Sequence, residues 1–149
     1  MGVSDSATTK CAMKIYLDID GTCIHEEIER AGEPARGLNE FLVALRPYEV
    51  FWLTTHCMDG NPEHATRLLK SKVPPELHAD IDRIKPTTWS VMKTEAIDFS
   101  GPFIWFDNDV MASEREVLKQ RAVQDEQWLI EVHLDENPEQ LMDIVRDFL

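Results

Sequence analysis

The stretch Lys14-Ile15-Tyr16-Leu17-Asp18-Ile19-Asp20-Gly21-Thr22 decides the predicted fold. Its first half is apolar and β-prone, which predicts a buried strand. Asp18 and Asp20 follow one residue apart, so a continuing strand would point both side chains the same way. Gly21 lets the chain turn where other residues would clash. We therefore expect both carboxylates at the carboxyl end of a strand, where open α/β sheets bind ligands.

The two carboxylates are close enough in sequence to influence each other. Neighbouring carboxylates repel unless a cation lies between them or one of them holds a proton. The stretch therefore indicates a metal ion, a proton-transfer role, or both.

Strands and helices alternate along the rest of the chain. Apolar runs predict further strands at 50–55, 103–106 and 128–134. Helical spacing and capping residues predict helices at 38–45, from 62 to about 72, from 87 to about 97, at 113–122 and from about 139 onward. Residues 76–86 show no clear pattern. The alternation predicts an α/β fold of three layers, with a central parallel sheet covered by helices on both faces.

The 149 residues fit one domain, which we place at 11–149 after a flexible tail at 1–10. The start of the chain is small and polar and does not resemble a signal peptide. No run approaches the roughly 18 apolar residues of a membrane span, so no membrane partner is expected. The three cysteines are scattered and odd in number, which favours a reducing, cytoplasmic location over a disulfide framework; they are Cys11, Cys23 and Cys57.

The net charge of −13 is the most informative bulk property. A chain this acidic repels polyanions, which argues against binding to extended nucleic acid. Acidity also keeps a protein soluble, so the charge alone does not identify a partner.

Three predicted strands end in polar residues that suit one kind of chemistry. Asp18 and Asp20 follow the first strand, Thr54-Thr55 ends the second, and Asp107 ends a later one. Lys85 and Lys93 are candidate cations between the last two. If these ends converge, the carboxylates suit Mg²⁺, which takes oxygen ligands and keeps waters and substrate phosphate in its shell. Thr and Lys would supply donors to phosphoryl oxygens, so the pattern indicates phosphoryl transfer.

The same motifs resemble those of the haloacid dehalogenase (HAD)-like hydrolase superfamily. Asp18-Ile19-Asp20-Gly21-Thr22 after an apolar strand resembles the first motif, and Thr54 after Val50-Phe51-Trp52-Leu53 the second. A lysine resembles the third, and Asp107 after Phe103-Ile104-Trp105-Phe106 the fourth. The match covers roughly residues 14 to 110. The family's Rossmann-like parallel sheet agrees with the alternation of strands and helices.

The resemblance implies a phosphatase with a role for each residue. Asp18 would attack phosphorus and form an aspartyl-phosphate. Asp20 would protonate the leaving oxygen and then accept a proton from water. Thr54 and the lysine would bind the phosphoryl group. Mg²⁺ would be held by the Asp18 carboxylate, the Asp20 backbone carbonyl and Asp107. An acid at position 20 favours phosphate hydrolysis, because a halide leaving group needs no proton.

Two positions leave alternatives open. Lys93 heads a segment that resembles the family's lysine-led helix and is preferred as the phosphate-binding lysine, while Lys85-Pro86 resembles a common variant. Family members often carry a second acidic residue soon after the fourth-motif aspartate. Here Asn108 follows, and Asp109 comes next. Either Asn108 ligates weakly or through water, or Asp109 completes the metal site.

The intervals between motifs bear on the substrate. Neither Asp20 to Thr54 nor Thr54 to Lys93 has room for the family's large cap domains, so the resemblance implies a capless, open site. Such a site suits a phosphoprotein, a terminal phosphate, or a small phosphate ester shielded by a neighbouring subunit of a homo-oligomer. A short acidic flap with Glu26, Glu27 and Glu29 would repel polyphosphates.

Other interpretations explain fewer residues. The acidic spacing from Asp18 partly matches an EF-hand loop, but Cys23 occupies the place of its glycine and a strand precedes it. A phospho-receiver domain places its acceptor aspartate on a later strand. We expect His25, His56 and Cys57 to be packing or polar loop residues. The alternative function is a non-catalytic or regulatory domain that binds metal or phosphate without turnover.

Overall fold

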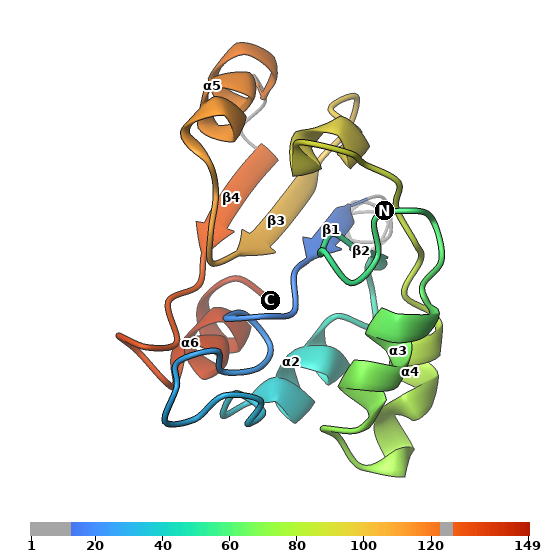
Figure 1. Ribbon diagram of the computed structural model, residues 1–149, viewed down its shortest axis with the longest axis vertical. Helices are drawn as coiled ribbons and strands as arrows, with labels where there is room; N and C mark the ends of the chain where they lie inside the picture. Colours follow the sequence, from blue (N-terminus) through green and yellow to red (C-terminus); the bar gives the residue numbers. More distant parts are fainter. Residues whose placement is uncertain (1–12, 123–126) are drawn as a thin grey trace, which may run out of the picture.

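A computed structural model describes residues 13–122 and 127–149 (Figure 1). The tail expected at 1–10, and Cys11 with it, lies outside the described residues. Four parallel strands form the central sheet: β1 (Lys14–Leu17), β2 (Glu49–Trp52), β3 (Phe103–Asp107) and β4 (Gln127–Glu131). The predicted α/β fold with a parallel sheet is confirmed, and it is consistent with a Rossmann-like architecture.

The strand order β2-β1-β3-β4 makes β1 the point where the chain changes direction across the sheet. From β1 the chain goes first to β2 on one side, and later to β3 on the other. In open parallel sheets, ligands bind in the crevice outside the carboxyl ends of the strands at such a switch point. The topology therefore singles out the space after β1 and β3.

The remaining elements lie between and after these strands. They are α2 (Leu38–Ala44), α3 (Glu63–Lys70), η1 (Pro75–Leu77), α4 (His78–Asp82), η2 (Lys93–Ala96), α5 (Ala112–Arg121) and α6 (Gln140–Asp147). In the unclear segment 76–86, Lys85 adds one isolated bridge to Phe51 at the outer edge of β2. Between β1 and α2, Ile24 pairs with Pro34 and closes a small acidic flap.

Alternating side chains of the strands feed two separate apolar cores. Ile15 and Leu17 pack with α2, α3, α4 and α6, whereas Tyr16 packs with the residues around η2 and α5. Figure 1 shows α2 and α6 together on one side of the strands and α5 on the other. Both faces are thus covered, because a strand with two apolar faces must bury both.

The helix expected from 87 to about 97 was wrong. Only the 3₁₀ turn η2 forms there, and residues 87–92 are not helical. Glu95 accepts hydrogen bonds from the backbone N–H groups of Ser90, Val91 and Met92. A side chain therefore satisfies the donors that a helix would have paired with backbone carbonyls. In the described part of the chain, every helix is too short or too polar to cross a bilayer.

Replacing Phe41 on α2 with alanine should destabilise the fold by about 3 kcal/mol or more, because it removes a fully buried ring from the core. Phe41 is 0% exposed, and its ring packs edge-on against Phe106 of β3 at 5.3 Å. Urea unfolding measures the change. Val43→Ala on the same helix, at a side chain that is 42% exposed, is the control and should change stability by no more than about 0.5 kcal/mol. Equal effects of the two substitutions would contradict this packing.

Candidate functional site

The register of the sheet brings the predicted strand ends together. Leu17 of β1 lies beside Trp52 of β2 and Phe106 of β3. The Asp18 N–H donates to the Phe106 carbonyl at 3.1 Å, which fixes Asp18 next to Asp107. Both carboxylates therefore lie in the crevice at the switch point of the sheet. Asp18 is 5% exposed and Asp107 is fully buried.

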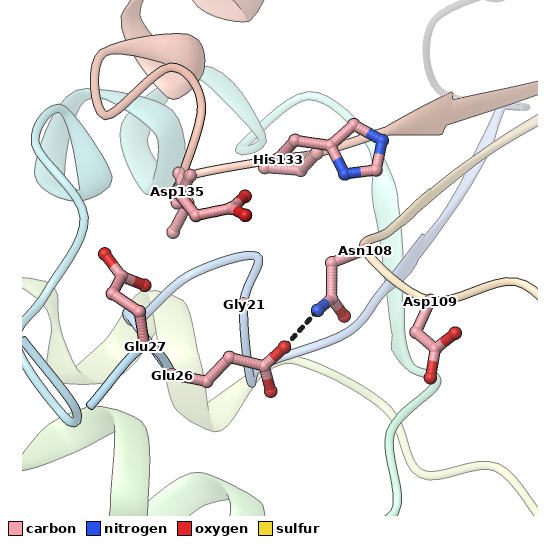
Figure 2. A pocket seen from close by; sticks show the side chains of 9 residues that line it. Gly21, Glu26, Glu27, Asn108, Asp109, His133 and Asp135 are labelled. Atoms are coloured by element: carbon pink, nitrogen blue, oxygen red, sulfur yellow. Dashed lines mark hydrogen bonds between the residues drawn. The ribbon is translucent and has the colours of Figure 1, made fainter.

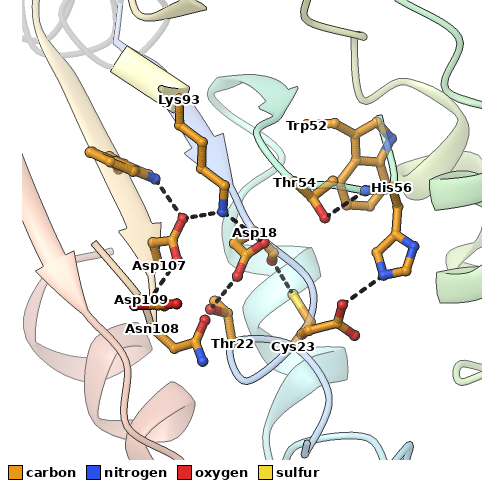
Figure 3. Close-up of polar contacts among 12 residues, drawn as sticks. Asp18, Thr22, Cys23, Trp52, Thr54, His56, Lys93, Asp107, Asn108 and Asp109 are labelled. Atoms are coloured by element: carbon orange, nitrogen blue, oxygen red, sulfur yellow. Dashed lines mark hydrogen bonds and ion pairs between the residues drawn. The ribbon is translucent and has the colours of Figure 1, made fainter. Parts of the chain in front are cut away.

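Lys93 lies between these two carboxylates (Figure 3). Its Nζ is 2.6 Å from Asp107 Oδ2 and 3.2 Å from Asp18 Oδ1. Lys85 instead pairs with Glu49 on the surface, with its side chain 58% exposed. The structure thus places Lys93, the preferred candidate, in the crevice, and Lys85 away from it.

The electrostatics of this group follow from its burial. Desolvation and the neighbouring Asp107 carboxylate raise the pKa of Asp18, while Lys93 works against that rise. Burial disfavours the charge of Lys93, but the two carboxylates outweigh it and raise the pKa of the amine. One ammonium does not compensate two buried carboxylates, so the crevice favours either a further cation or a proton on Asp18.

Asp107 is held from two more directions. Its Oδ2 accepts a hydrogen bond from Trp105 Nε1 at 3.1 Å, and its Oδ1 accepts one from the Asp109 N–H at 3.0 Å. These bonds fix the orientation of a buried carboxylate that would otherwise be expensive to desolvate. Lone pairs on Oδ1 remain for another ligand.

Two glutamates hold Lys93 in place, and the sequence pattern did not single out either of them as a site residue. Glu114, buried in the first turn of α5, accepts the backbone N–H of Lys93 at 2.6 Å and that of Met111 at 3.0 Å. Glu95 closes the loop just before Lys93. The spacing from Met111 to Glu114 is typical of a carboxylate that caps its own helix, but its second partner is 21 residues away and leaves no local signal.

Asp20 lies beside this ionic group and contacts His56. The distance between Asp20 Oδ2 and His56 Nε2 is 2.7 Å. His56 lies in a turn, so it is a polar loop residue as expected, and the contact with Asp20 adds a partner that the sequence did not indicate. His25 and Cys57 are buried, as expected of packing residues.

Thr54 follows β2 and is fully buried. Its Oγ1 accepts the backbone N–H of His56 at 3.3 Å, which leaves the hydroxyl hydrogen free to be donated elsewhere. Thr55, not Thr54, lines the cavity described next. The two threonines thus offer one buried and one exposed hydroxyl at the edge of the site.

Two neighbouring cavities open at this edge. One of about 320 Å³ is lined by Asp18, Asp20, Glu26, Thr55, Trp89, Val91, Lys93, Asp107, Asn108, Asp109, Met111 and Glu114. A larger one of about 460 Å³, whose lining Figure 2 shows, includes neither Asp18 nor Asp107. Its polar lining includes Glu26, Glu27, Asp109, His133 and Asp135. Glu26, Asn108 and Asp109 line both.

A hydrogen bond beside Gly21 joins two residues that line both cavities. Asn108 Nδ2 donates to Glu26 Oε1 at 2.6 Å and so joins the flap to the loop after β3. Gly21 has a φ of +75°, and a Cβ there would lie 2.1 Å from Asn108 Nδ2. Glycine is thus required both for the turn and for the passage of the Asn108 side chain. The bond to Glu26 uses the Asn108 NH2 group and leaves its amide oxygen available, so both Asn108 and Asp109 stay candidates to face an added cation.

The donor set fits Mg²⁺ only in part. Among residues 13–122 and 127–149, no group of three His, Cys, Asp or Glu side chains is arranged to hold a metal ion. Asp18 and Asp107 offer two buried carboxylates, and Asp20 offers a backbone carbonyl. Mg²⁺ commonly binds through one or two carboxylates and completes its shell with waters and phosphate. The oxygen donors and the surplus negative charge are compatible with that arrangement.

Comparisons with protein-family models, with curated proteins and with solved structures found no match.

Replacing Glu95 with glutamine should remove a pH-dependent contribution to stability. Hydrogen bonds from the backbone N–H groups of Met92, Ser90 and Val91 lower the pKa of Glu95 to about 2 from an ordinary value of 4.5. A lowered pKa stabilises the fold above pH 4.5, and this contribution is lost as pH falls from 4.5 toward 2. The difference in urea stability between wild type and Glu95→Gln should shrink over that window. The exposed Glu29→Gln serves as control. A difference that stays constant with pH would contradict the assignment.

Proposed function

We propose that the protein is a Mg²⁺-dependent phosphoester hydrolase of the HAD type, with an open, capless site and an aspartyl-phosphate intermediate. One observation supports this proposal above all: Lys93 bridges Asp18 and Asp107 at the switch point of the sheet. These are the residues to which the resemblance assigns the nucleophile, the metal ligand and the phosphate-binding cation.

In the proposed reaction, an Asp18 oxygen forms a bond to phosphorus while the bond from phosphorus to the ester oxygen breaks. The electron pair stays on the leaving oxygen, which takes a proton from Asp20. Water then attacks the aspartyl-phosphate, gives its proton to Asp20 and frees Asp18. Lys93 would offset the charge on the phosphoryl oxygens, and the Thr54 hydroxyl would donate a hydrogen bond to one of them.

The metal would be held by the Asp18 carboxylate, the Asp20 backbone carbonyl and Asp107. When bound, Mg²⁺ would supply positive charge to the phosphoryl oxygens and offset the repulsion between the two buried carboxylates. Asn108 and Asp109 follow Asp107 and line the same cavity, and the amide oxygen of the first or the carboxylate of the second would support an outer water. Removing the metal should therefore abolish turnover.

The substrate class follows from the surroundings of the site. Short connections rather than an inserted domain surround the crevice, and acidic residues line the neighbouring cavity. Such a mouth disfavours polyanions. A phosphoprotein, a small phosphate ester or a single terminal phosphate fits best, in a cytoplasmic setting. A second subunit could shield a small ester.

The second candidate is a non-catalytic or regulatory domain of the same architecture. The ion pair of Lys93 with Asp18 and Asp107 favours it in one respect, because a satisfied buried group can serve structure alone. This candidate predicts Mg²⁺ or phosphate binding without formation of an aspartyl-phosphate.

Substitution of Asp18 by asparagine should lower turnover on the order of 10³-fold or more, since it removes the attacking oxygen. The measurement is Mg²⁺-dependent phosphate release from a broad panel of phosphopeptides, small esters and 5′- or 3′-phosphorylated oligonucleotides. Asp82→Asn is the matched control, because Asp82 lies on α4 and pairs with Lys70 outside the site. Activity retained in Asp18→Asn would remove Asp18 as the nucleophile.

The two candidate functions separate in a trapping experiment. Fluoroberyllate with Mg²⁺ should form an adduct on Asp18 of a phosphatase and none on Asp18→Asn. Mg²⁺ binding with no adduct, and with no phosphate released from the panel, would favour the non-catalytic domain.

A further inference from the structure

Asp20 is restrained by a residue from the neighbouring strand end. His56 follows β2, and its Nε2 lies 2.7 Å from Asp20 Oδ2. Asp20 lines the cavity over Lys93, whereas His56 lines the adjacent cavity of about 330 Å³ with Thr55, Met58, Asp59, Asn61 and His64. His56 thus contacts the Asp20 carboxyl from outside the cavity over Lys93.

A second histidine fixes the tautomer of the first. His64, in the first turn of α3, places its Nδ1 3.3 Å from His56 Nδ1, with ring centroids 4.8 Å apart. A neutral imidazole has one donor and one acceptor nitrogen. If His56 Nε2–H donates to Asp20, then His56 Nδ1 must accept from His64 Nδ1–H. This assignment gives a donor and an acceptor to both hydrogen bonds that connect His64 through His56 to Asp20.

His56 also contacts Thr54, the residue proposed to bind the phosphoryl group. Its backbone N–H donates to Thr54 Oγ1 at 3.3 Å, which occupies one lone pair of that hydroxyl. The side chain and the backbone of one residue thus restrain both an expected proton donor and an expected phosphate ligand.

We propose that His56 is a positioning residue for Asp20 and that His64 fixes the tautomer this requires. His56 anchors Oδ2 of Asp20, which leaves Oδ1 as the oxygen that passes a proton to the leaving oxygen as the ester bond breaks, and takes one back from the attacking water. The inference rests on the proposed function. A carboxyl anchored at one oxygen loses less orientational freedom when it reacts.

The test compares leaving groups of different acidity. An alkyl phosphate needs a proton on its leaving oxygen, whereas p-nitrophenyl phosphate leaves readily without one. His56→Phe keeps a ring but removes the donor, so kcat/KM, which reports the step that breaks the ester bond, should fall on the order of 10²-fold for the alkyl ester and by less than about tenfold for the aryl ester. His56→Gln, which retains a donor near the position of Nε2, should restore most of the loss.

The second histidine provides an internal check. His64→Asn retains a donor near the position of Nδ1 and should be close to wild type, whereas His64→Phe should show a weaker form of the same preference for the aryl ester. His78→Phe on α4 is the control and should alter neither ester selectively. Equal losses of kcat/KM on both esters, or no recovery of kcat/KM in His56→Gln, would overturn the proposal, since a merely structural role predicts uniform effects on the step that breaks the ester bond.

A measurement without turnover separates this inference from the proposed function. Long-range ¹H–¹⁵N NMR of the wild type, at a pH where both rings are neutral, should show His56 as the Nε2–H tautomer and His64 as the Nδ1–H tautomer. The opposite pair of tautomers would overturn the inference even in an active enzyme. If the expected tautomers are found in a protein that hydrolyses no ester, the proposed hydrolase function is wrong. The hydrogen bonds from His64 to His56 and from His56 to Asp20 would then be present without a catalytic role.

Discussion

The ion pair of Lys93 with Asp18 and Asp107 is the interaction on which the rest of the site depends. Two carboxylates taken out of water cost several kcal/mol each unless partners compensate them. Lys93 supplies one positive charge, and Trp105 and the Asp109 backbone supply donors to Asp107. The remaining negative charge requires either a further cation or a proton on Asp18, whose pKa is raised. A crevice with this balance is suited to a cation together with an anionic group, which is what a metal and a phosphoryl group would bring.

Holding an ammonium between two buried carboxylates requires a rigid base, and the short turn η2 does not provide one alone. Glu114 connects the Lys93 backbone to the start of α5, and Glu95 ties the loop before Lys93 to the turn that follows. Carboxylates that accept backbone N–H groups in this way replace regular secondary structure. The lysine is thus presented by two side-chain anchors, one of them on a different element.

The sequence predicted those parts of the molecule that depend on local patterns. Apolar runs located all four strands, and the motif at Asp18 marked the strand end where Lys93 and Asp107 converge. The helix predicted at 87–92 does not form, because Glu95 accepts hydrogen bonds from the backbone N–H groups of this segment. The spacing of apolar residues does not reveal that competition. The contact of His56 with Asp20 joins residues 36 apart, and periodicity carries no information about such a pair.

The restraint on Asp20 bears on which esters the proposed enzyme would favour. A leaving group that is already a weak base departs without a proton, so a precisely held acid gives it little advantage. An alkoxide leaving group does need that proton, and for it the chain from His64 through His56 to Asp20 would matter most. Negative side chains beside the mouth add a second constraint, because they disfavour substrates with several phosphates. Together these features suit a monoester of an alcohol, with a neutral or positively charged leaving group, and disfavour a polyanion.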